Sequence, residues 1–192
     1  MKTERQPASD RVPSESECRA LAEEHGMLHN IKAHSEAVMR VATSIVDDLV
    51  APDGMERPLV VAAALLHDIT KTRALGTRER HDKSGGELVR GLGMERVARI
   101  IEQHVYLESF APDGPLLESE IVYYADKRVM HDTVVSLDER LEDLVVRYGG
   151  TPEREALIRG NFELARAVEA KIARRMRSGA RGLQALCGLA DE

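Results

Sequence analysis

The sequence has few aromatic residues and few cysteines. It contains no Trp, two Phe and four Tyr, so a platform of aromatic rings for stacking single-stranded nucleic acid is not expected. The two cysteines, Cys18 and Cys187, stand near opposite ends of the chain and do not suggest a disulfide framework. We therefore expect a protein of a reducing, cytoplasmic compartment.

Long apolar runs and an excess of basic charge are also missing. The longest uninterrupted apolar run covers residues 59–66, whereas a membrane span needs roughly 20 residues. Residues 1–17 contain no apolar core of a secretory signal, so we expect no association with membranes. The net charge is −6, from 33 acidic and 27 basic side chains. Nucleic-acid-binding domains usually carry a basic excess, and a nucleic-acid partner is therefore not expected.

The length and composition suit one folded domain. The chain has 192 residues, of which 43% are hydrophobic and 31% charged, which is enough to bury a core without disulfide bonds. We expect a polar N-terminal segment over residues 1–13, a single domain over 14–178 and a tail over 179–192. The sequence leaves the formation of a homo-oligomer open.

Apolar residues recur at helical spacing along most of the chain, and no alternating strand pattern persists. The fold class predicted from this pattern is all-α. Residues 72–82 are polar and are predicted as a loop. The expected helices cover about residues 14–26, 27–49, 58–66, 83–92, 94–104, 117–131, 136–148 and 151–178.

Ionisable side chains fall on the apolar faces of five of these helices. A single inward His is more often a core residue than a metal ligand. Burying an uncompensated carboxylate, however, costs several kcal/mol, and two carboxylates occur here with no equally inward Arg or Lys. One shared cation would compensate both. We therefore expect a metal site made by His34, His67, Asp68, His81, His104 and Asp126.

Four of these residues carry a resemblance to a known family. His34, then the pair His67 and Asp68, then Asp126 resembles the H…HD…D signature of the HD-domain superfamily of metal-dependent phosphohydrolases. The local sequences are HSEAVMRVA, ALLHDITK and YYADKRV, and the resemblance covers residues 27–131. It implies a compact HD-domain helical bundle, here with a long C-terminal helix, in which these four residues hold one divalent ion.

Two further histidines match the subset of this superfamily that binds two metals. His81 in RHDKSGGELV and His104 in IIEQHV occupy the places where that subset carries two additional ligands. By resemblance, both would join Asp68 on a second ion, with the Asp68 carboxylate bridging the two. Carboxylate and imidazole ligands suit iron, manganese, cobalt, magnesium or zinc without choosing among them. The motif order and size are similar to those of bacterial HD-type dinucleoside polyphosphate hydrolases, and a GYP triplet typical of HD-GYP phosphodiesterases is missing.

The resemblance implies hydrolysis of a phosphate ester or anhydride, in a small phosphorylated metabolite or a nucleotide, by water that the metal activates. Asp68 and Lys71 are the predicted catalytic residues. Lys71 stands three residues after Asp68, one helical turn on, and is predicted to bind a substrate phosphate, the alternative being an exposed lysine at a helix end. Lys127 and Arg128 flank Asp126 and are predicted to neutralise phosphate charge, with at least one of them facing solvent.

Two other functions stay open at this stage. An HD module can retain metal while it senses a nucleotide or scaffolds a partner, and mixed-valent di-iron HD oxygenases share the six ligands. The basic stretch over residues 171–181 is expected to be a solvated face or a surface for another subunit. His29 and His131 fall outside the metal pattern. Four aromatic residues near the expected site could stack on a nucleobase, although packing is the commoner role: Tyr106, Phe110, Tyr123 and Tyr124.

Overall fold

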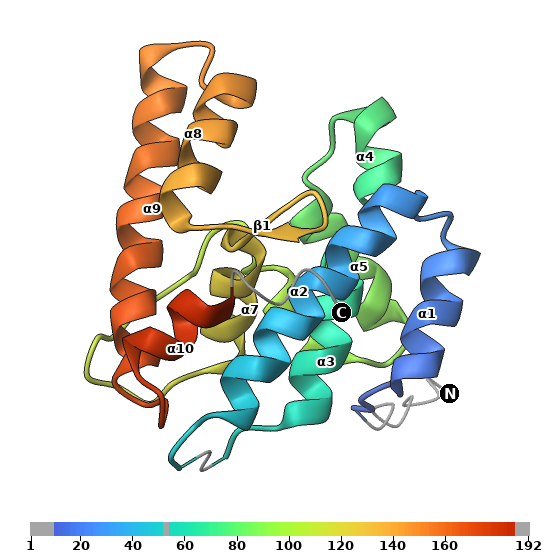
Figure 1. Ribbon diagram of the computed structural model, residues 1–192. Coiled ribbons are helices and arrows are strands. Elements are labelled where there is room, and N and C mark those ends of the chain that lie inside the picture. The colour runs from blue at the N-terminus through green and yellow to red at the C-terminus, as the bar shows by residue number, and fades with distance from the viewer. Residues whose placement is uncertain (1–9, 52–53, 187–192) are drawn as a thin grey trace, which may run out of the picture.

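Helices make up nearly all the regular structure of the computed structural model, which describes residues 10–51 and 54–186. The all-α prediction is confirmed, and Figure 1 shows the arrangement. Residues 1–9, Pro52, Asp53 and the tail from Cys187 onward lie outside the described residues. The elements are α1 (Glu15–Glu24), α2 (His29–Asp47), α3 (Arg57–Leu66), α4 (Lys71–Thr77), α5 (His81–Gly91), α6 (Glu95–Ile101), α7 (Glu118–Lys127), β1 (Val129–Met130), β2 (Thr133–Val134), α8 (Leu137–Tyr148), α9 (Pro152–Ala173) and α10 (Ala180–Ala185).

Several helices begin where the sequence predicts them. Ser14 and Ser136 cap α1 and α8, and in each case the glutamate three residues later completes a capping box. Thr151 caps α9, and Pro152 follows at the first helical position. Such caps satisfy backbone N–H groups that have no partner within the helix. Across the described residues, no helix is long and apolar enough to cross a membrane.

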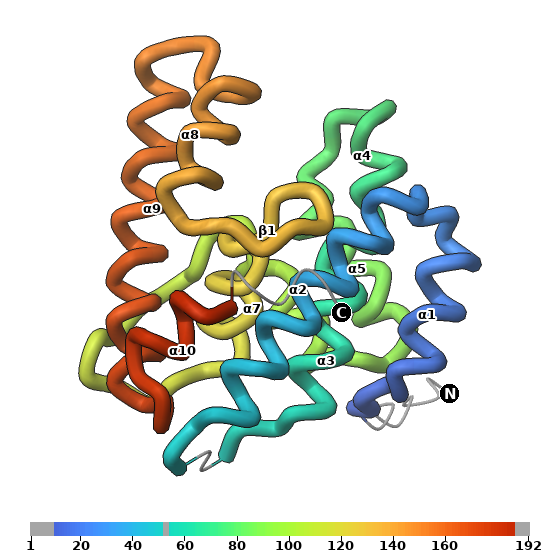
Figure 2. The backbone as a smooth tube through the Cα atoms, in the orientation of Figure 1, coloured from blue at the N-terminus to red at the C-terminus, as the bar shows by residue number. Residues whose placement is uncertain are grey.

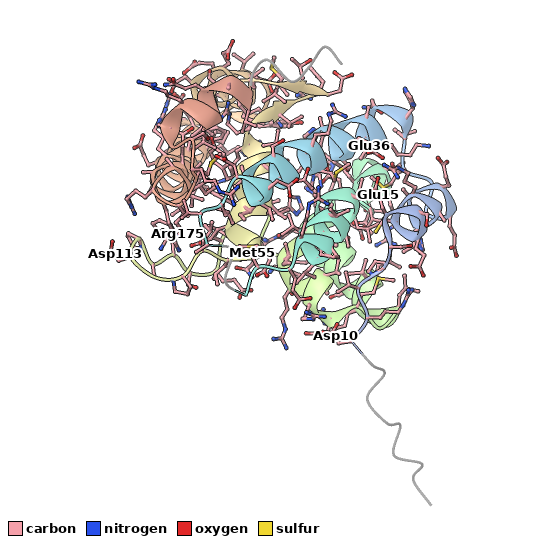
Figure 3. All side chains as sticks on the ribbon, turned by 60° about the horizontal axis from the view of Figure 1, so that its bottom comes forward. Asp10, Glu15, Glu36, Met55, Asp113 and Arg175 are labelled. Carbon is pink, nitrogen blue, oxygen red and sulfur yellow. The ribbon has the colours of Figure 1, made fainter. Side chains whose placement is uncertain are left out.

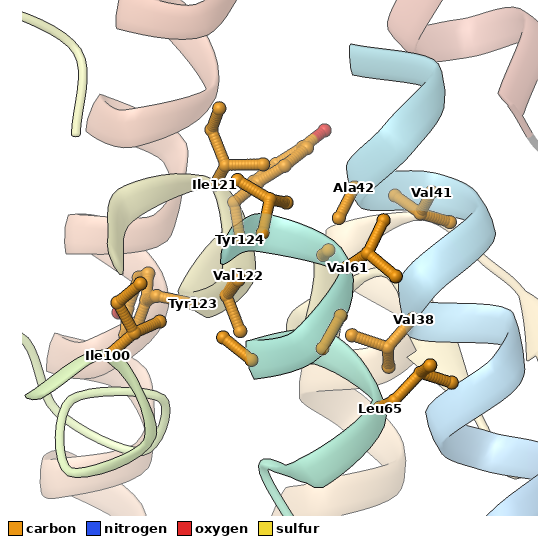
Figure 4. Close-up of a cluster of buried hydrophobic side chains, with 14 of the residues drawn as sticks. Val38, Val41, Ala42, Val61, Leu65, Ile100, Ile121, Val122, Tyr123 and Tyr124 are labelled. Carbon is orange, nitrogen blue, oxygen red and sulfur yellow. The ribbon is translucent and has the colours of Figure 1, made fainter. Parts of the chain in front are cut away.

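The core is built around α3, whose residues 59–66 are all buried. A helix that is apolar on every side must be covered on every side, and α1, α2, α6 and α7 pack around it. Figure 2 shows α2 lying alongside α3. In the close-up of Figure 4, Val38 and Val41 of α2 face Val61 and Leu65 of α3, with the buried residues of α7 on the other side. Each such side chain contributes about 1.5–3 kcal/mol on full burial.

Two elements differ from the predicted ones. Residues 72–82 are not a loop throughout, because α4 forms there; none of its residues is buried, so it carries no apolar stripe that a sequence pattern could reveal. The helix expected over 117–131 ends at Lys127, and a two-stranded hairpin follows, with His131 at its turn in a left-handed conformation (φ 57°). Strands of two residues are too short to show an alternating pattern.

The C-terminal part also departs from the expectation. The last long helix ends at Ala173 rather than near residue 178, and α10 forms inside the predicted tail, where it buries Leu183. The basic stretch is not a uniformly solvated face, because Lys171 is buried against Glu120 and the guanidinium of Arg175 donates to the carbonyl oxygen of Gly114. Figure 3 shows Arg175 beside the loop that carries Asp113. These contacts attach α9 to α7 and to the loop before it.

The helical pair α8 and α9 stands on the opposite side of the molecule from α4, with the β1–β2 hairpin between them (Figure 1). Helix α8 packs along α9, and α9 in turn packs on α7. Side chains from α4, α7, α8 and α9 therefore reach one common region, which is where the candidate site lies.

Candidate metal centre

Six side chains that the sequence predicted as metal ligands come together from separate elements. His34 is on α2, His67 and Asp68 are in the turn after α3, and the other three are His81 at the start of α5, His104 just after α6 and Asp126 on α7. All but His81 and Asp126 are buried. The core packing of α2, α3, α6 and α7 thus fixes the backbone positions from which most of the cluster projects.

A close approach of α5 to α6 brings His81 to His104. Gly85 lies one turn after His81 on the same face of α5, and a Cβ atom at this glycine would stand 3.3 Å from Cγ2 of Ile101. The turn after α3 is linked to α5, because the Thr70 hydroxyl donates to the His81 carbonyl oxygen at 2.9 Å. These contacts place His81 opposite both Asp68 and His104.

One group of candidate ligands consists of His34, His67 and Asp68, whose ligand atoms all lie within 4.8 Å of one another. Nε2 of His67 is 3.4 Å from Oδ2 of Asp68 and 3.7 Å from Oδ1 of Asp126. Nε2 of His34 is 3.1 Å from the same Asp126 oxygen. Asp126 therefore adjoins this group, as the HD resemblance implies.

A second group consists of Asp68, His81 and His104. Oδ1 of Asp68 lies 3.3 Å from Nε2 of His81 and 3.6 Å from Nε2 of His104. The two Nε2 atoms are 3.2 Å apart. Asp68 belongs to both groups and presents a different oxygen to each, which is the arrangement required of a carboxylate that bridges two ions.

Three of the histidines are held by backbone carbonyl groups. Nδ1 of His34 lies 2.7 Å from the carbonyl oxygen of His131, Nδ1 of His67 lies 2.7 Å from that of Ala64, and Nδ1 of His104 lies 2.7 Å from that of Ile101. A carbonyl oxygen only accepts, so each Nδ1 donates and the tautomer follows from the contact. In the neutral form of His67 and His104, the Nε2 lone pair then points into the cluster, as in ligating histidines. Nε2 of His34 faces the Asp126 carboxylate oxygen at 3.1 Å.

The chemistry of the cluster fits a divalent metal ion. Among the described residues, Nε2 of His67 and Oδ1 of Asp68 are buried without a hydrogen-bond partner. Buried polar atoms are nearly always partnered, so two unpartnered acceptors at the centre of one cluster need an explanation. A cation would satisfy both, and imidazole nitrogens with carboxylate oxygens are ligands that several first-row divalent metals accept.

The electrostatics keep both carboxylates ionised. Burial disfavours the charge of Asp68, but Lys71 and His67 outweigh it and hold the pKa of this carboxyl well below its usual range. Burial also opposes the charge of Asp126, where His34 and Lys127 lower the pKa well below its usual range. Burial lowers the pKa of His104, which favours the neutral ring that a metal requires.

The lysines that the sequence singled out are both near the cluster. Nζ of Lys71 lies 2.6 Å from Oδ2 of Asp68. Lys127 is buried, donates from Nζ to the His104 carbonyl oxygen at 2.8 Å and lies 3.7 Å from the centre of the Tyr123 ring. Burial lowers the pKa of Lys127 to about 8. The expectation that Lys127 or Arg128 faces solvent is wrong, because both side chains are buried.

Arg128 points away from the cluster, contrary to its predicted role in binding substrate. It stands two residues after Asp126, which is about 200° around the helix axis. Its Nε donates to the carbonyl oxygen of Val135 and its Nη2 to that of Leu183. Arg128 therefore links the end of α7 to the segment before α8 and to α10.

A cavity of about 430 Å³ adjoins the cluster and has a volume typical of small-molecule sites. His81, His104, Asp126, Lys71 and Lys127 line it on the side of the cluster. Its other walls are mostly apolar and come from α4, the segment after His104, α8 and α9. They are formed by Ala74, Leu75, Val105, Tyr106, Leu144, Tyr148, Ile158 and Phe162, with the polar residues Glu79, Arg140 and Asn161.

Some residues of the cavity could not be identified from the sequence, and some residues that the sequence suggested lie in the core instead. Arg140 and Asn161 lie on elements far along the chain from the HD motif, and the carbonyl group of His131 has no sequence signal of its own. Of the four aromatic residues expected near the site, Tyr106 lines the cavity at its rim, whereas Tyr123 and Tyr124 are fully buried in the core. His29 is exposed, as expected.

Comparison with known proteins shows similarity to a protein family and to a curated protein. A family model described as HD domain matches residues 31–130, just over half of the chain. A tRNA (cytidine(56)-2'-O)-methyltransferase of Picrophilus torridus is 26% identical over 146 residues, which are 68% of this chain and 40% of that protein. The chain thus spans less than half the length of this relative. No solved structure matches the chain significantly.

Proposed function

This chain belongs to the HD domain family, and from that premise we propose that it is a metal-dependent phosphohydrolase. The reaction would cleave a phosphate ester or anhydride in a small phosphorylated compound, nucleotides included. One observation carries the proposal. The Asp68 carboxylate belongs to two groups of candidate metal ligands at once, and the cluster opens on a cavity of small-molecule size.

The proposed ligands divide between two ions. His34, His67, Asp68 and Asp126 would hold one, and Asp68, His81 and His104 the other. Iron, manganese, cobalt, magnesium and zinc all accept this donor set. When bound, two divalent ions lower the pKa of a coordinated water toward 7, from about 15.7 in bulk, and neutralise the charge that develops on the phosphoryl oxygens.

The residues of the chain would position the substrate around this centre. Lys127 and Lys71 both line the cavity and bring positive charge to the side where the ligands lie. Lys71 also donates to Asp68 and so holds the orientation of the shared carboxylate. Among the described residues that line the cavity, none is Ser, Thr or Cys. The cavity therefore offers no hydroxyl or thiol of these types as a nucleophile, which favours attack by water.

The test is phosphate release by the purified protein. The protein is treated with a chelator, reloaded separately with each of the five metals and assayed with nucleotides, dinucleoside polyphosphates and sugar phosphates. We expect release from at least one class of compound only after metal is restored. The two histidines of α2 provide a matched pair of variants: His34→Ala should lose the activity, and His29→Ala, which changes an exposed histidine of the same helix, should keep it.

Three outcomes would contradict the proposal. Phosphate release that survives the chelator would remove the metal from the mechanism. Oxygen consumption by the iron-loaded protein without phosphate release would point to an oxygenase. Nucleotide binding without turnover under any metal would point to a sensing or scaffold module.

A further inference from the structure

Arg140 on α8 lies in the wall of the cavity next to the metal centre, outside the segment that matches the family model. It lines the same cavity as His81, His104 and Asp126. Its side chain is only 11% exposed, which is unusual for an arginine and indicates that the protein around it fixes its position.

Not every N–H group of the Arg140 guanidinium has a hydrogen-bond partner in the described part of the chain. Nη1 is 2.5 Å from Oδ2 of Asp143, one turn along α8. Arg147 lies 3.3 Å from that same oxygen, so two arginines share one carboxylate. Nε of Arg140 is buried and has no hydrogen-bond partner among the described residues. A buried donor without an acceptor is unfavourable, so this group is prepared to bind an anion.

The face of α8 that lines the cavity carries Arg140 near one end and an apolar surface farther along the helix. Arg140, Leu144 and Tyr148 follow one another at intervals of four residues, which places them on one face of the helix, and all three line the cavity. Ile158 and Phe162 of α9 continue the apolar surface. Tyr148, two turns from Arg140, is 55% exposed. The wall thus runs from a buried cation beside the metal centre to an aromatic ring at the protein surface.

Positive charge is concentrated at the inner part of this wall. Lys71, Lys127 and Arg140 all line the cavity, and each comes from a different helix. The acidic groups near them already have partners. Asp68 and Asp126 belong to the candidate metal centre, and Asp143 pairs with two arginines. Glu79, which also lines the cavity, pairs with Arg73. A phosphate is the anion that three converging cations beside a metal centre suit best.

We propose that Arg140 is a substrate-binding residue that contacts a phosphate oxygen, while the apolar faces of α8 and α9 contact the uncharged part of the same substrate. This inference rests on the proposed phosphohydrolase function and specifies the orientation of its substrate. The phosphate lies between the metal centre and Arg140, and the organic part extends along Leu144 toward Tyr148. Such a wall selects a compound with its negative charge at one end and an apolar or aromatic group at the other.

The test measures phosphate binding separately from turnover. Inorganic phosphate is titrated calorimetrically into the metal-loaded wild-type protein and into Arg140→Met, and KM and kcat are measured with the best substrate of the release screen. We expect Arg140→Met to weaken phosphate binding and to raise KM by about 10- to 100-fold, as expected for a lost hydrogen bond between charged groups. Metal content should stay unchanged and kcat should fall much less than KM rises. Arg140→Lys should lie between the two, because it keeps the charge but loses the planar fork.

Arg159→Met is the matched control. It removes an arginine of α9 that pairs with Glu155 and with Glu142 of α8, and Arg159 does not line this cavity. Its phosphate affinity and KM should equal those of the wild type. A second variant, Tyr148→Ala, separates the two halves of the proposal: it should raise KM for a substrate with an aromatic group and leave the affinity for inorganic phosphate unchanged.

The outcomes distinguish this inference from the proposed function. If the wild type releases phosphate in a metal-dependent way and both Arg140 variants bind phosphate as tightly as the wild type, the role of Arg140 is wrong and the proposed function stands. If the metal-loaded wild type neither binds inorganic phosphate nor releases it from any compound, both fail. If Arg140→Met does not fold, the Arg140→Lys variant decides, and an unchanged affinity in it would overturn the inference.

Discussion

Nζ of Lys71 lies 2.6 Å from Oδ2 of Asp68, so the cation predicted to bind substrate contacts the carboxylate shared by the two ligand groups. Asp68 is fully buried, whereas about a third of the Lys71 side chain is exposed and lines the cavity. The ammonium can therefore hold Asp68 and face a substrate at the same time. Burial disfavours its charge, but Asp68 and Asp126 outweigh that effect and raise the pKa of Lys71, which keeps it positive.

Replacement of Lys71 should separate catalysis from metal binding. An ammonium group has no lone pair for a metal, so Lys71→Ala should keep the metal content of the wild type. Phosphate release should fall by about 10- to 100-fold, if the lost interaction is worth roughly 1.4–2.7 kcal/mol in the transition state. Lys71→Arg should recover part of the activity. Elemental analysis together with steady-state kinetics measures both effects.

Lys32 provides the control for this prediction. It also pairs with a carboxylate, that of Glu23, but it does not line the cavity beside the metal centre. Lys32→Ala should leave the kinetics unchanged. Wild-type kinetics in a metal-replete Lys71→Ala protein would show that Lys71 has no part in the reaction.

The number of ions can be tested at the second ligand group. His81 and His104 contact Oδ1 of Asp68, and neither is among the residues placed around the first ion. His81→Ala and His104→Ala should therefore each lose about one of two ions and retain the other. Metal-to-protein ratios from elemental analysis decide the matter. A single ion in the wild type, unaffected by either change, would leave only the first site.

The buried ion pair between Glu120 and Lys171 leads to a prediction about the free energy of unfolding. Nζ of Lys171 lies 2.7 and 2.8 Å from the two carboxylate oxygens, and both side chains are 1% exposed. Lys171→Met leaves an uncompensated buried charge and should lower the free energy of unfolding by about 3–5 kcal/mol. The double variant Glu120→Gln with Lys171→Met should recover much of that loss. Urea denaturation gives the free energy of unfolding of the wild type, the single variant and the double variant. Equal values would show that the ion pair contributes nothing to stability.

The sequence was most informative where a residue type conflicts with its position. His34 and Asp126 lie on helices with buried apolar faces, and His67 and His104 follow such helices closely. The structure brings them together because those helices pack on a common core. The helix caps at Ser14, Ser136 and Thr151 could also be predicted, because capping depends on residues adjacent in the chain.

The parts that could not be predicted depend on distant or purely backbone contacts. Helix α4 buries no residue and so lacks an apolar stripe, and the β1–β2 hairpin is too short for a pattern. Burial of Lys127 and Arg128 depends on the carbonyl groups of His104, Val135 and Leu183, which have no signature in the side-chain sequence. The place of Arg140 beside the ligands depends on how α8 and α9 pack on α7, which local patterns do not determine.

The metal content of Asp68→Asn tests the central claim most directly. The substitution keeps the shape of the side chain and removes the charge that both ligand groups share, so elemental analysis should find close to two divalent ions per chain in the wild type and almost none in the variant. Because Lys71 loses the buried carboxylate with which it pairs, the melting temperature should fall as well. Full metal stoichiometry with an unchanged melting temperature in Asp68→Asn would contradict a metal centre shared at this carboxylate.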